Sequence, residues 1–331
     1  MKIGLIGCGK QAPKHISGLR IDDSVEIVVC DIDAERAKKV GTAHDLAWTD
    51  DVEALFADDQ VAAVDIATPT LTHAPLVRQA IESGKHYFCE KPFCESLADA
   101  EAIVARSEDA GVIGMVGYVY RHAPVFQVGH ELCGNDDGNN WPLGKPVSAF
   151  FRIGGRGDHE LWKHQKATSG GAISEMMVHM VDLAIWYFGE PQSASLIAQD
   201  LLRPVRTISG QAVEVDAEDY VLARFDSADG PSYVVQADLV TPAFSQYVEV
   251  QFEHGSYLGS IQGDVASYVF STRDTDAYKS GKSPLEFGTV NLFERQMASF
   301  VSHVRERRPV TLNSVEDSLR LMRAMNLLNH D

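Results

Sequence analysis

The sequence has few cysteines and a shortage of positive charge. Its five cysteines, Cys8, Cys30, Cys89, Cys94 and Cys133, follow no disulfide framework, and the spacing of Cys89 and Cys94 matches no common zinc site. We therefore expect reduced thiols, no bound metal and a cytoplasmic protein. The formal net charge of −18 argues against nucleic acid and anionic membranes as partners, but not against a dinucleotide held by backbone groups.

Long apolar runs are also missing. No stretch approaches the length of a membrane span, and no basic segment or cleavage site precedes the first apolar residues, so we expect no signal peptide. The chain has 331 residues, 45% of them hydrophobic and 23% charged, which is ordinary for a globular protein with room for two domains.

The start of the chain has the order strand, glycine turn, helix, strand. Residues 2–6 and 25–30 are short apolar runs, Gly7-Cys8-Gly9 follows the first run, 11–20 can be helical, and Asp31 ends the second run. This order predicts a dinucleotide site: Gly7 permits a tight turn, Gly9 lets a pyrophosphate approach the backbone, and the helix N-terminus faces the anion. Ala12 replaces the third glycine of the usual pattern, which that position tolerates. The alternative is an ordinary turn between a strand and a helix.

Asp31 stands where a carboxylate would bind a ribose diol. It would repel a 2′-phosphate, so we predict NAD(H) rather than NADP(H). We assign the following to the cofactor site: Gly7, Cys8, Gly9, Lys10, Gln11, Asp31, Ile32, Thr68, Pro69, Thr70, His73, Glu90 and Lys91.

Alternating strands and helices continue to about Arg121 and predict a doubly wound parallel sheet. Further strands are expected at 43–47, 61–67, 86–89 and 112–116, and further helices at 33–40, 51–56, 73–83 and 97–110. Strands in direct succession then predict an antiparallel sheet. They lie at 146–153, 219–225, 233–240, 247–252 and 257–262. A long helix follows Gly170-Gly171 and runs to about Phe188, and two closing helices are expected at 292–307 and 314–329. We expect two domains, 1–121 for the dinucleotide and 122–331 for substrate binding and oligomerisation.

Two polar segments leave the expected parallel sheet at its carboxyl edge, where ligands bind. They are Thr68-Pro69-Thr70 with His73, and Glu90-Lys91-Pro92. A cation such as Lys91 beside a hydroxyl carbon can hydrogen-bond the substrate oxygen and stabilise a developing alkoxide. The alternative is a salt-bridged surface turn.

The helix after Gly170-Gly171 is apolar except for Glu175, His179 and Asp182, whose spacing places them on one face. Histidine is well suited to accept a hydroxyl proton near pH 7, and a neighbouring carboxylate would orient it. The alternative is a Glu175–His179 pair in which the two side chains only hydrogen-bond each other and have no role in catalysis.

A basic segment spans residues 152–166 of this acidic chain. It contains Arg152, Arg156, His159, Trp162, Lys163 and Lys166. It would hold an anionic group of the substrate, or it is a solvated loop with one buried tryptophan.

Together these motifs resemble the Gfo/Idh/MocA oxidoreductase family over most of the chain. The resemblance rests on Gly7-Cys8-Gly9, Thr68-Pro69 with His73, Gly84-Lys85-His86 leading to Cys89-Glu90-Lys91-Pro92, Tyr120-Arg121 with Pro124, and Gly170-Gly171 through Glu175, His179 and Asp182. It implies an N-terminal Rossmann domain and a C-terminal domain with a large open antiparallel sheet.

The resemblance also implies roles for single residues. Lys91 would bind the reacting oxygen, His179 would be the acid/base, and the Lys91–Pro92 bond can be cis. Glu175 replaces the family's usual aspartate, so it either contacts substrate or only supports His179. We assign Glu175 with the catalytic residues, and Arg121, Arg152, Trp162 and Asp182 to substrate binding.

The expected function is hydride transfer between NAD and a carbinol carbon of a sugar, cyclitol or sugar derivative. One alternative is an NAD-dependent glycoside hydrolase or lyase that acts through a transient keto-sugar. Another is an NAD-bound sensor without turnover. An exposed face of a large antiparallel sheet would suit a homodimer or homotetramer.

Overall fold

The computed structural model describes residues 1–134, 141–157, 160–228 and 230–329. His159 of the basic segment lies outside them. The chain forms two compact units, Met1–Val119 with Asn291–Leu319 and Tyr120–Val290 with Arg320–Asp331. The expected division at 121/122 is near the break after Val119, but the structure differs by returning Asn291–Leu319 to the first unit.

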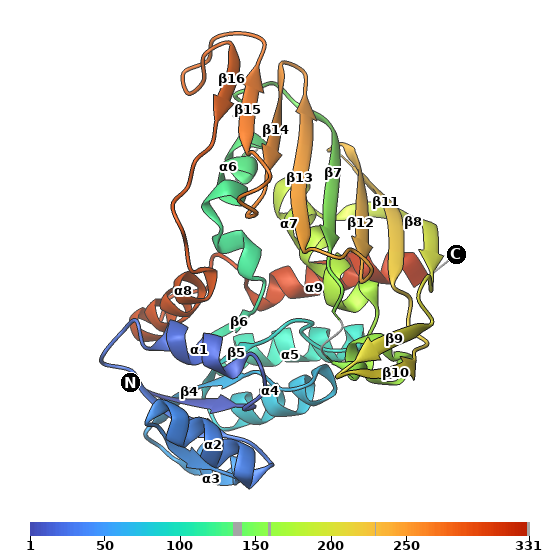
Figure 1. The fold of residues 1–331 in the computed structure, drawn as a ribbon. Helices are drawn as coiled ribbons and strands as arrows, with labels where there is room; N and C mark the ends of the chain where they lie inside the picture. The colour runs from blue at the N-terminus through green and yellow to red at the C-terminus, as the bar shows by residue number, and fades with distance from the viewer. Residues whose placement is uncertain (135–140, 158–159, 229, 330–331) are drawn as a thin grey trace. The chain divides into compact units, whose positions relative to one another are not determined.

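The first unit contains a parallel sheet of six strands within the described residues, in the order β3-β2-β1-β4-β5-β6 (Figure 1). The strands are β1 (Lys2–Ile6), β2 (Glu26–Cys30), β3 (Ala47–Thr49), β4 (Val61–Ile66), β5 (His86–Cys89) and β6 (Gly114–Val116). Strand β1 lies between β2 and β4, and its Ile3 pairs with both Ile27 and Ala63. The order of strands reverses there, and ligands bind at the carboxyl edge beside such a reversal.

Local capping explains where several helices of this unit begin. The helices are α1 (Ala12–Leu19), α2 (Ala34–His44), α3 (Val52–Ala57), α4 (His73–Glu82), α5 (Leu97–Ala110) and α8 (Leu292–Glu306), with a short 3₁₀ turn η1 (Thr70–Thr72). The side chains of Asp33, Asp51 and Ser96 each accept a backbone N–H from the first turn that follows. Helix α2 continues to His44, so the prediction of a strand from residue 43 was wrong: the chain turns only at Asp45, in the left-handed region.

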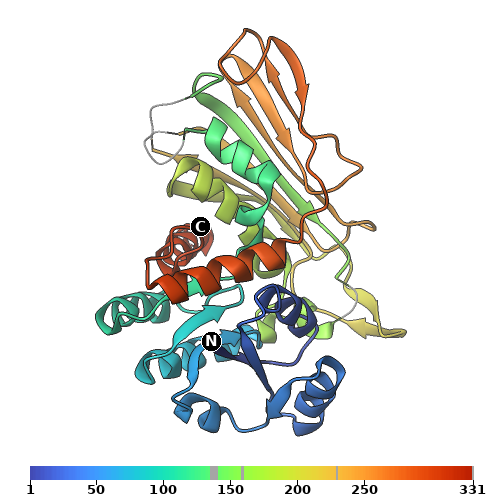
Figure 2. The same ribbon diagram turned by 90° about the vertical axis from the view of Figure 1, so that its left-hand side faces the viewer.

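Helix α8 packs against α1, and this contact joins the returning segment Asn291–Leu319 to the first unit (Figures 1 and 2). Met297 and Phe300 of α8 are fully buried in one core with Ile16. A Cβ on Gly18 would lie 2.8 Å from the side chain of Met297, so glycine permits the close approach of the two helices.

The second unit contains a sheet with the order β16-β15-β14-β13-β7-β12-β11-β8, eight strands in the part of the chain that is described. They are β7 (Pro146–Gly154), β8 (Pro191–Asp200), β11 (Tyr220–Ser227), β12 (Ser232–Asp238), β13 (Ser245–Phe252), β14 (Gly255–Gly259), β15 (Tyr268–Ser271) and β16 (Gly281–Pro284). All neighbours are antiparallel except β7 and β12, so the sheet is mixed. Strands β9 (Val205–Ile208) and β10 (Gln211–Glu214) form a separate hairpin.

Two helices cover one face of this mixed sheet, α6 (Pro124–Leu132) and α7 (Val178–Phe188) (Figure 2). Residues alternate along β11, where Val221, Ala223 and Phe225 are fully buried. Helix α6 was not expected from the sequence. Helix α9 (Val315–Asn326) and the turn η6 (Leu327–Asn329) end the described chain. Among the described residues, no helix is both long and apolar enough to cross a membrane.

Candidate functional site

The glycine turn after β1 has the geometry that a dinucleotide needs. Gly7 has φ +103°, and a Cβ there would lie 2.5 Å from the carbonyl oxygen of Ala67. Only glycine fits such a position without strain. A Cβ on Gly9, in contrast, would meet nothing within 4 Å, so the space in front of this residue is open. The loop is therefore closed on its sheet side and open where a pyrophosphate would approach.

The residues around Gly9 also fit a bound dinucleotide. Lys10 is exposed, and α1 begins at Ala12 with Pro13 in its first turn. The buried Oε1 of Gln11 has no hydrogen-bond partner among the described residues. Ile32, just beyond β2, is 96% exposed and presents an apolar surface of the kind that would suit an adenine ring.

Asp31 holds the glycine loop against the end of β2. Its Oδ2 accepts the backbone N–H of Cys8 at 2.8 Å, its Oδ1 accepts that of Asp33 at 2.9 Å, and Arg36 lies 3.4 Å away. The Cys8 thiol is buried, and burial raises its pKa to about 12, so it is an inert side chain. The backbone amide of Cys8 is thus engaged by Asp31.

His73 connects the β4 and β5 loops. Its Nδ1 lies 2.8 Å from the carbonyl oxygen of Pro92, and its Nε2 lies 2.8 Å from that of Thr68. The ring is buried, and burial lowers its pKa. His73 therefore braces two loops in this structure, while its expected contact with the cofactor stays a prediction.

Glu90 and Lys91 follow β5 at the carboxyl edge of the parallel sheet. Glu90 donates its backbone N–H to Ile66 at 2.9 Å, and its Oε2 accepts the N–H of Lys91 at 3.1 Å. The Lys91–Pro92 bond is cis, as the resemblance implied. On its other side, Glu90 meets His15 of α1, a contact that the sequence did not suggest.

In the second unit, Glu175 lies in a π-helical turn, Ile173–Met177, directly before α7. The predicted helix is therefore not α-helical at its start, and the spacing that aligned Glu175 with His179 and Asp182 is not that of one regular helix. Glu218 caps this turn, since its Oε1 accepts the N–H of Ile173 at 3.0 Å. The ring of His179 lies 4.9 Å from the ring of Tyr120.

Lys163 of the basic segment is the partner of Glu175. Its Nζ lies 2.9 Å from Oε2 of this buried carboxylate. A Cβ on Gly170 would lie 2.5 Å from the carbonyl oxygen of Trp162, so glycine lets these two backbone segments pack closely. Lys163 also lies over the ring of Trp162, 5.2 Å from its centre. Lys163 and Glu175 were both singled out from the sequence, but their contact was not predicted.

Asp182 and Arg121, both expected to bind substrate, form a buried ion pair. Arg121 Nε donates to Oδ2 of Asp182 at 3.0 Å, and Nη2 donates to Oδ1 at 2.7 Å. The side chains are 2% and 1% exposed. In this structure the pair anchors α7 to the start of the second unit, and a contact with substrate stays a prediction.

Arg152 is also engaged within its own unit. Its Nη2 lies 2.6 Å from Oδ2 of Asp238 and donates to Oγ1 of Thr241 at 2.8 Å. Arg156 and Lys166 are exposed.

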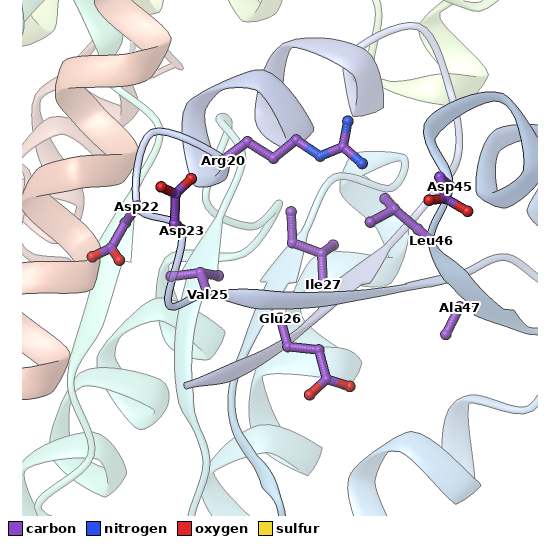
Figure 3. A pocket seen from close by; sticks show the side chains of 9 residues that line it. All are labelled: Arg20, Asp22, Asp23, Val25, Glu26, Ile27, Asp45, Leu46 and Ala47. Atoms are coloured by element: carbon purple, nitrogen blue, oxygen red, sulfur yellow. The ribbon is translucent and has the colours of Figure 1, made fainter.

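A cavity of about 410 Å³ lies elsewhere on the first unit (Figure 3). Its lining includes Glu26 and Ala47, the first residues of β2 and β3, and Arg20 just after α1. It therefore opens at the amino edge of the parallel sheet, away from the carboxyl edge that holds Gly9 and Lys91, and we do not connect it with the dinucleotide.

Two family models match the chain. The Gfo/Idh/MocA model, an oxidoreductase family with an NAD-binding Rossmann fold, matches residues 1–118, and the Gfo/Idh/MocA C-terminal domain matches residues 142–258. The chain belongs to the Gfo/Idh/MocA oxidoreductase family. Its first unit is an NAD-binding Rossmann domain, which confirms the predicted cofactor and fold class.

Relatives in this family act on several polyols and sugars. The chain is 34% identical to D-apiose dehydrogenase from Paraburkholderia graminis, over 57% of the chain and about half the length of that protein. It is 27% identical to myo-inositol 2-dehydrogenase from Thermotoga maritima, over 97% of the chain and 93% of the relative. Levoglucosan dehydrogenase in complex with NADH and L-sorbose has the same fold, with a TM-score of 0.86 at 20% identity, covering 99% of this chain and 96% of that one.

Proposed function

We propose that the protein is an NAD-dependent dehydrogenase of a sugar, cyclitol or sugar derivative. The observation that carries the proposal is the position of Lys91. It leaves β5 at the carboxyl edge of an NAD-binding Rossmann sheet, with Glu90 and Pro92 on either side held by His15 and His73.

In the proposed reaction, a carbinol is oxidised to a carbonyl compound. NAD⁺, when bound, supplies the acceptor for the hydride. Lys91 hydrogen-bonds the substrate oxygen and stabilises the negative charge that grows on it. His179 accepts the hydroxyl proton, so that one proton and one hydride leave together. Glu175, held by Lys163, orients His179 and steadies its charged form.

Lys91 and His179 belong to different compact units, so substitutions at the two positions test independent parts of the proposal. We expect Lys91→Ala and His179→Ala each to lower kcat by about a hundredfold or more, with NAD⁺ affinity nearly unchanged. Lys279→Ala is the matched control, because Lys279 is 83% exposed and its ammonium group lies 3.0 Å from Asp274. Full activity in both active-site variants would refute the mechanism.

The substrate class is tested by NADH absorbance across polyols, inositols, hexoses and uronic acids. Net NADH formation with one of these classes supports the dehydrogenase. Cleavage of a glycoside without net NADH would replace it by the hydrolase or lyase, and no change in NADH with any compound would favour a sensor. From the sequence we further propose a cytoplasmic protein that forms a homodimer or homotetramer. Sedimentation of the purified protein would test the oligomeric state.

A further inference from the structure

A buried histidine connects two carboxylates inside the Rossmann unit. Nδ1 of His15 lies 2.9 and 3.0 Å from the two carboxylate oxygens of Asp65, and Nε2 lies 3.0 Å from Oε1 of Glu90. The His15 and Asp65 side chains are 0% exposed, and that of Glu90 is 12% exposed. We call these residues the His15 triad. Its members come from α1, from β4 and from the end of β5.

With Asp65 and Glu90 both ionised, the contacts of the two ring nitrogens require a charged imidazole. A neutral ring has one N–H, whereas both nitrogens of His15 face a carboxylate that can only accept when it is ionised. Burial raises the pKa of Asp65, and the contact with His15 opposes that rise. Burial alone lowers the pKa of His15, but the charges and hydrogen bonds of Asp65 and Glu90 outweigh burial and raise the pKa to about 10. Burial raises the pKa of Glu90, and its contact with His15 outweighs that effect and lowers it.

A further hydrogen bond connects the His15 triad to Lys91 through Glu90. Glu90 Oε1 is held by His15, and its Oε2 accepts the N–H of Lys91 at 3.1 Å. A Cβ on Gly117 would lie 3.1 Å from the Glu90 carboxyl group, so glycine leaves the space that this carboxyl group occupies. The ring of His15 packs against the rings of Phe88 and Phe293, whose centres lie 5.7 and 5.8 Å away. The orientation of Glu90 is thus fixed from both sides.

We infer that His15 is a positioning residue for hydride transfer: as an imidazolium it fixes the Glu90 carboxylate, which in turn fixes the backbone that carries Lys91. This inference rests on the proposed role of Lys91. A purely stabilising role explains the triad less well, since well-packed apolar residues stabilise a core as much as a buried ion cluster does. Asp65 and His15 are fully buried, so neither touches substrate, and the contact of His15 with Glu90 is the one that leads towards Lys91.

The test is a double-mutant cycle on the full chain with His15→Gln, Glu90→Gln and the pair. We expect His15→Gln to lower kcat about tenfold to a hundredfold, as loss of a group that orients a functional residue does elsewhere, while the Kd of NAD⁺ changes less than about threefold. The pair should be no slower than Glu90→Gln alone, because both changes remove the same restraint. His303→Gln is the matched control: His303 is buried in α8 of the same unit and lies 3.3 Å from the carbonyl oxygen of Arg308.

Two further measurements keep the inference falsifiable if His15→Gln fails to fold. Asp65→Asn retains the shape of the triad and should also lower kcat with little effect on NAD⁺ binding. Nitrogen-15 NMR of the histidine rings in the wild-type protein should show His15 protonated on both nitrogens at pH 8, a readout that is independent of catalysis.

The outcomes separate this inference from the proposed function. If Lys91→Ala is inactive but His15→Gln and Asp65→Asn keep kcat within about twofold, the inference fails and the proposed function stands. Additive losses in the cycle, a control variant as slow as His15→Gln, or a neutral His15 ring would also overturn it. Full activity of Lys91→Ala would overturn the proposed function itself, whatever the state of His15.

Discussion

The buried Arg121–Asp182 pair predicts a stability pattern that can be worked out in advance. The side chains are 2% and 1% exposed, and the guanidinium meets both carboxylate oxygens. Removing one partner leaves the other charge buried and uncompensated, which costs about 3–5 kcal/mol in free energy of unfolding. At 1.4 kcal/mol per tenfold, this corresponds to a rise in the unfolding constant of about two to three and a half powers of ten.

Removing both charges at once should cost far less. We expect Arg121→Met/Asp182→Leu to lie within about 1 kcal/mol of the wild-type protein, because no isolated charge remains. The single variants Arg121→Met and Asp182→Leu, taken with the double variant, should therefore give a coupling energy of about 5 kcal/mol or more. Urea unfolding followed by tryptophan fluorescence is the assay, since the Arg121 guanidinium lies 5.7 Å from the ring of Trp186.

The same unit offers a matched control. Arg224 and Asp226 are 2.7 Å apart, but their side chains are 53% and 38% exposed. We expect Asp226→Asn to cost less than about 1 kcal/mol. If Asp182→Asn or Arg121→Met costs no more than this exposed control, the argument from desolvation is refuted.

Two other predictions concern the Rossmann unit. Gly7→Ala should lower the free energy of unfolding by about 1–3 kcal/mol, because its Cβ meets Ala67 at positive φ, whereas Gly9→Ala should fold normally and bind NAD⁺ about tenfold more weakly by calorimetry. Equal losses of stability in both would contradict this. The pKa of His15 is raised from 6.5 to about 10. The protonated ring therefore stabilises the folded state fully below pH 6.5, and this stabilisation is lost as the pH rises towards 10. In that window the unfolding free energy of the wild-type protein should fall by up to about 1.4 kcal/mol per pH unit relative to that of the double variant His15→Gln/Asp65→Asn. Urea titrations at several pH values are the measurement, and the same pH dependence in both proteins would disprove the prediction.

Local signals in the sequence predicted much of the fold. Asp33 and Asp51 cap the helices that follow them, and apolar runs gave the parallel strands to within a few residues. The return of Asn291–Leu319 to the first unit and the parallel pairing of β7 with β12 depend on contacts between segments far apart in the chain. Periodicity carries no information about such contacts, so neither was predicted.

The candidate site shows the same limit. Gly7, Gly9 and Lys91 belong to motifs that can be recognised from residue spacing alone. The structure places them at the carboxyl edge of the parallel sheet, as expected. The partners of these residues carry no such signal. His15 occupies an ordinary position of a short amphipathic helix, and nothing in its neighbours connects it with Asp65, fifty residues later.

The contact with Lys163 gives a physical reason for a glutamate at position 175, where the family usually has aspartate. An added methylene extends the carboxylate by about 1 Å, a shift large enough to alter catalytic geometry, and here the longer acid meets Lys163 at 2.9 Å. That contact also changes the interpretation of the basic segment. Arg152 and Lys163 both have carboxylate partners, so the segment offers an anionic substrate less positive charge than its composition suggests. Because a paired cation must give up its partner to bind a new anion, this arrangement favours a neutral polyol over a uronic acid.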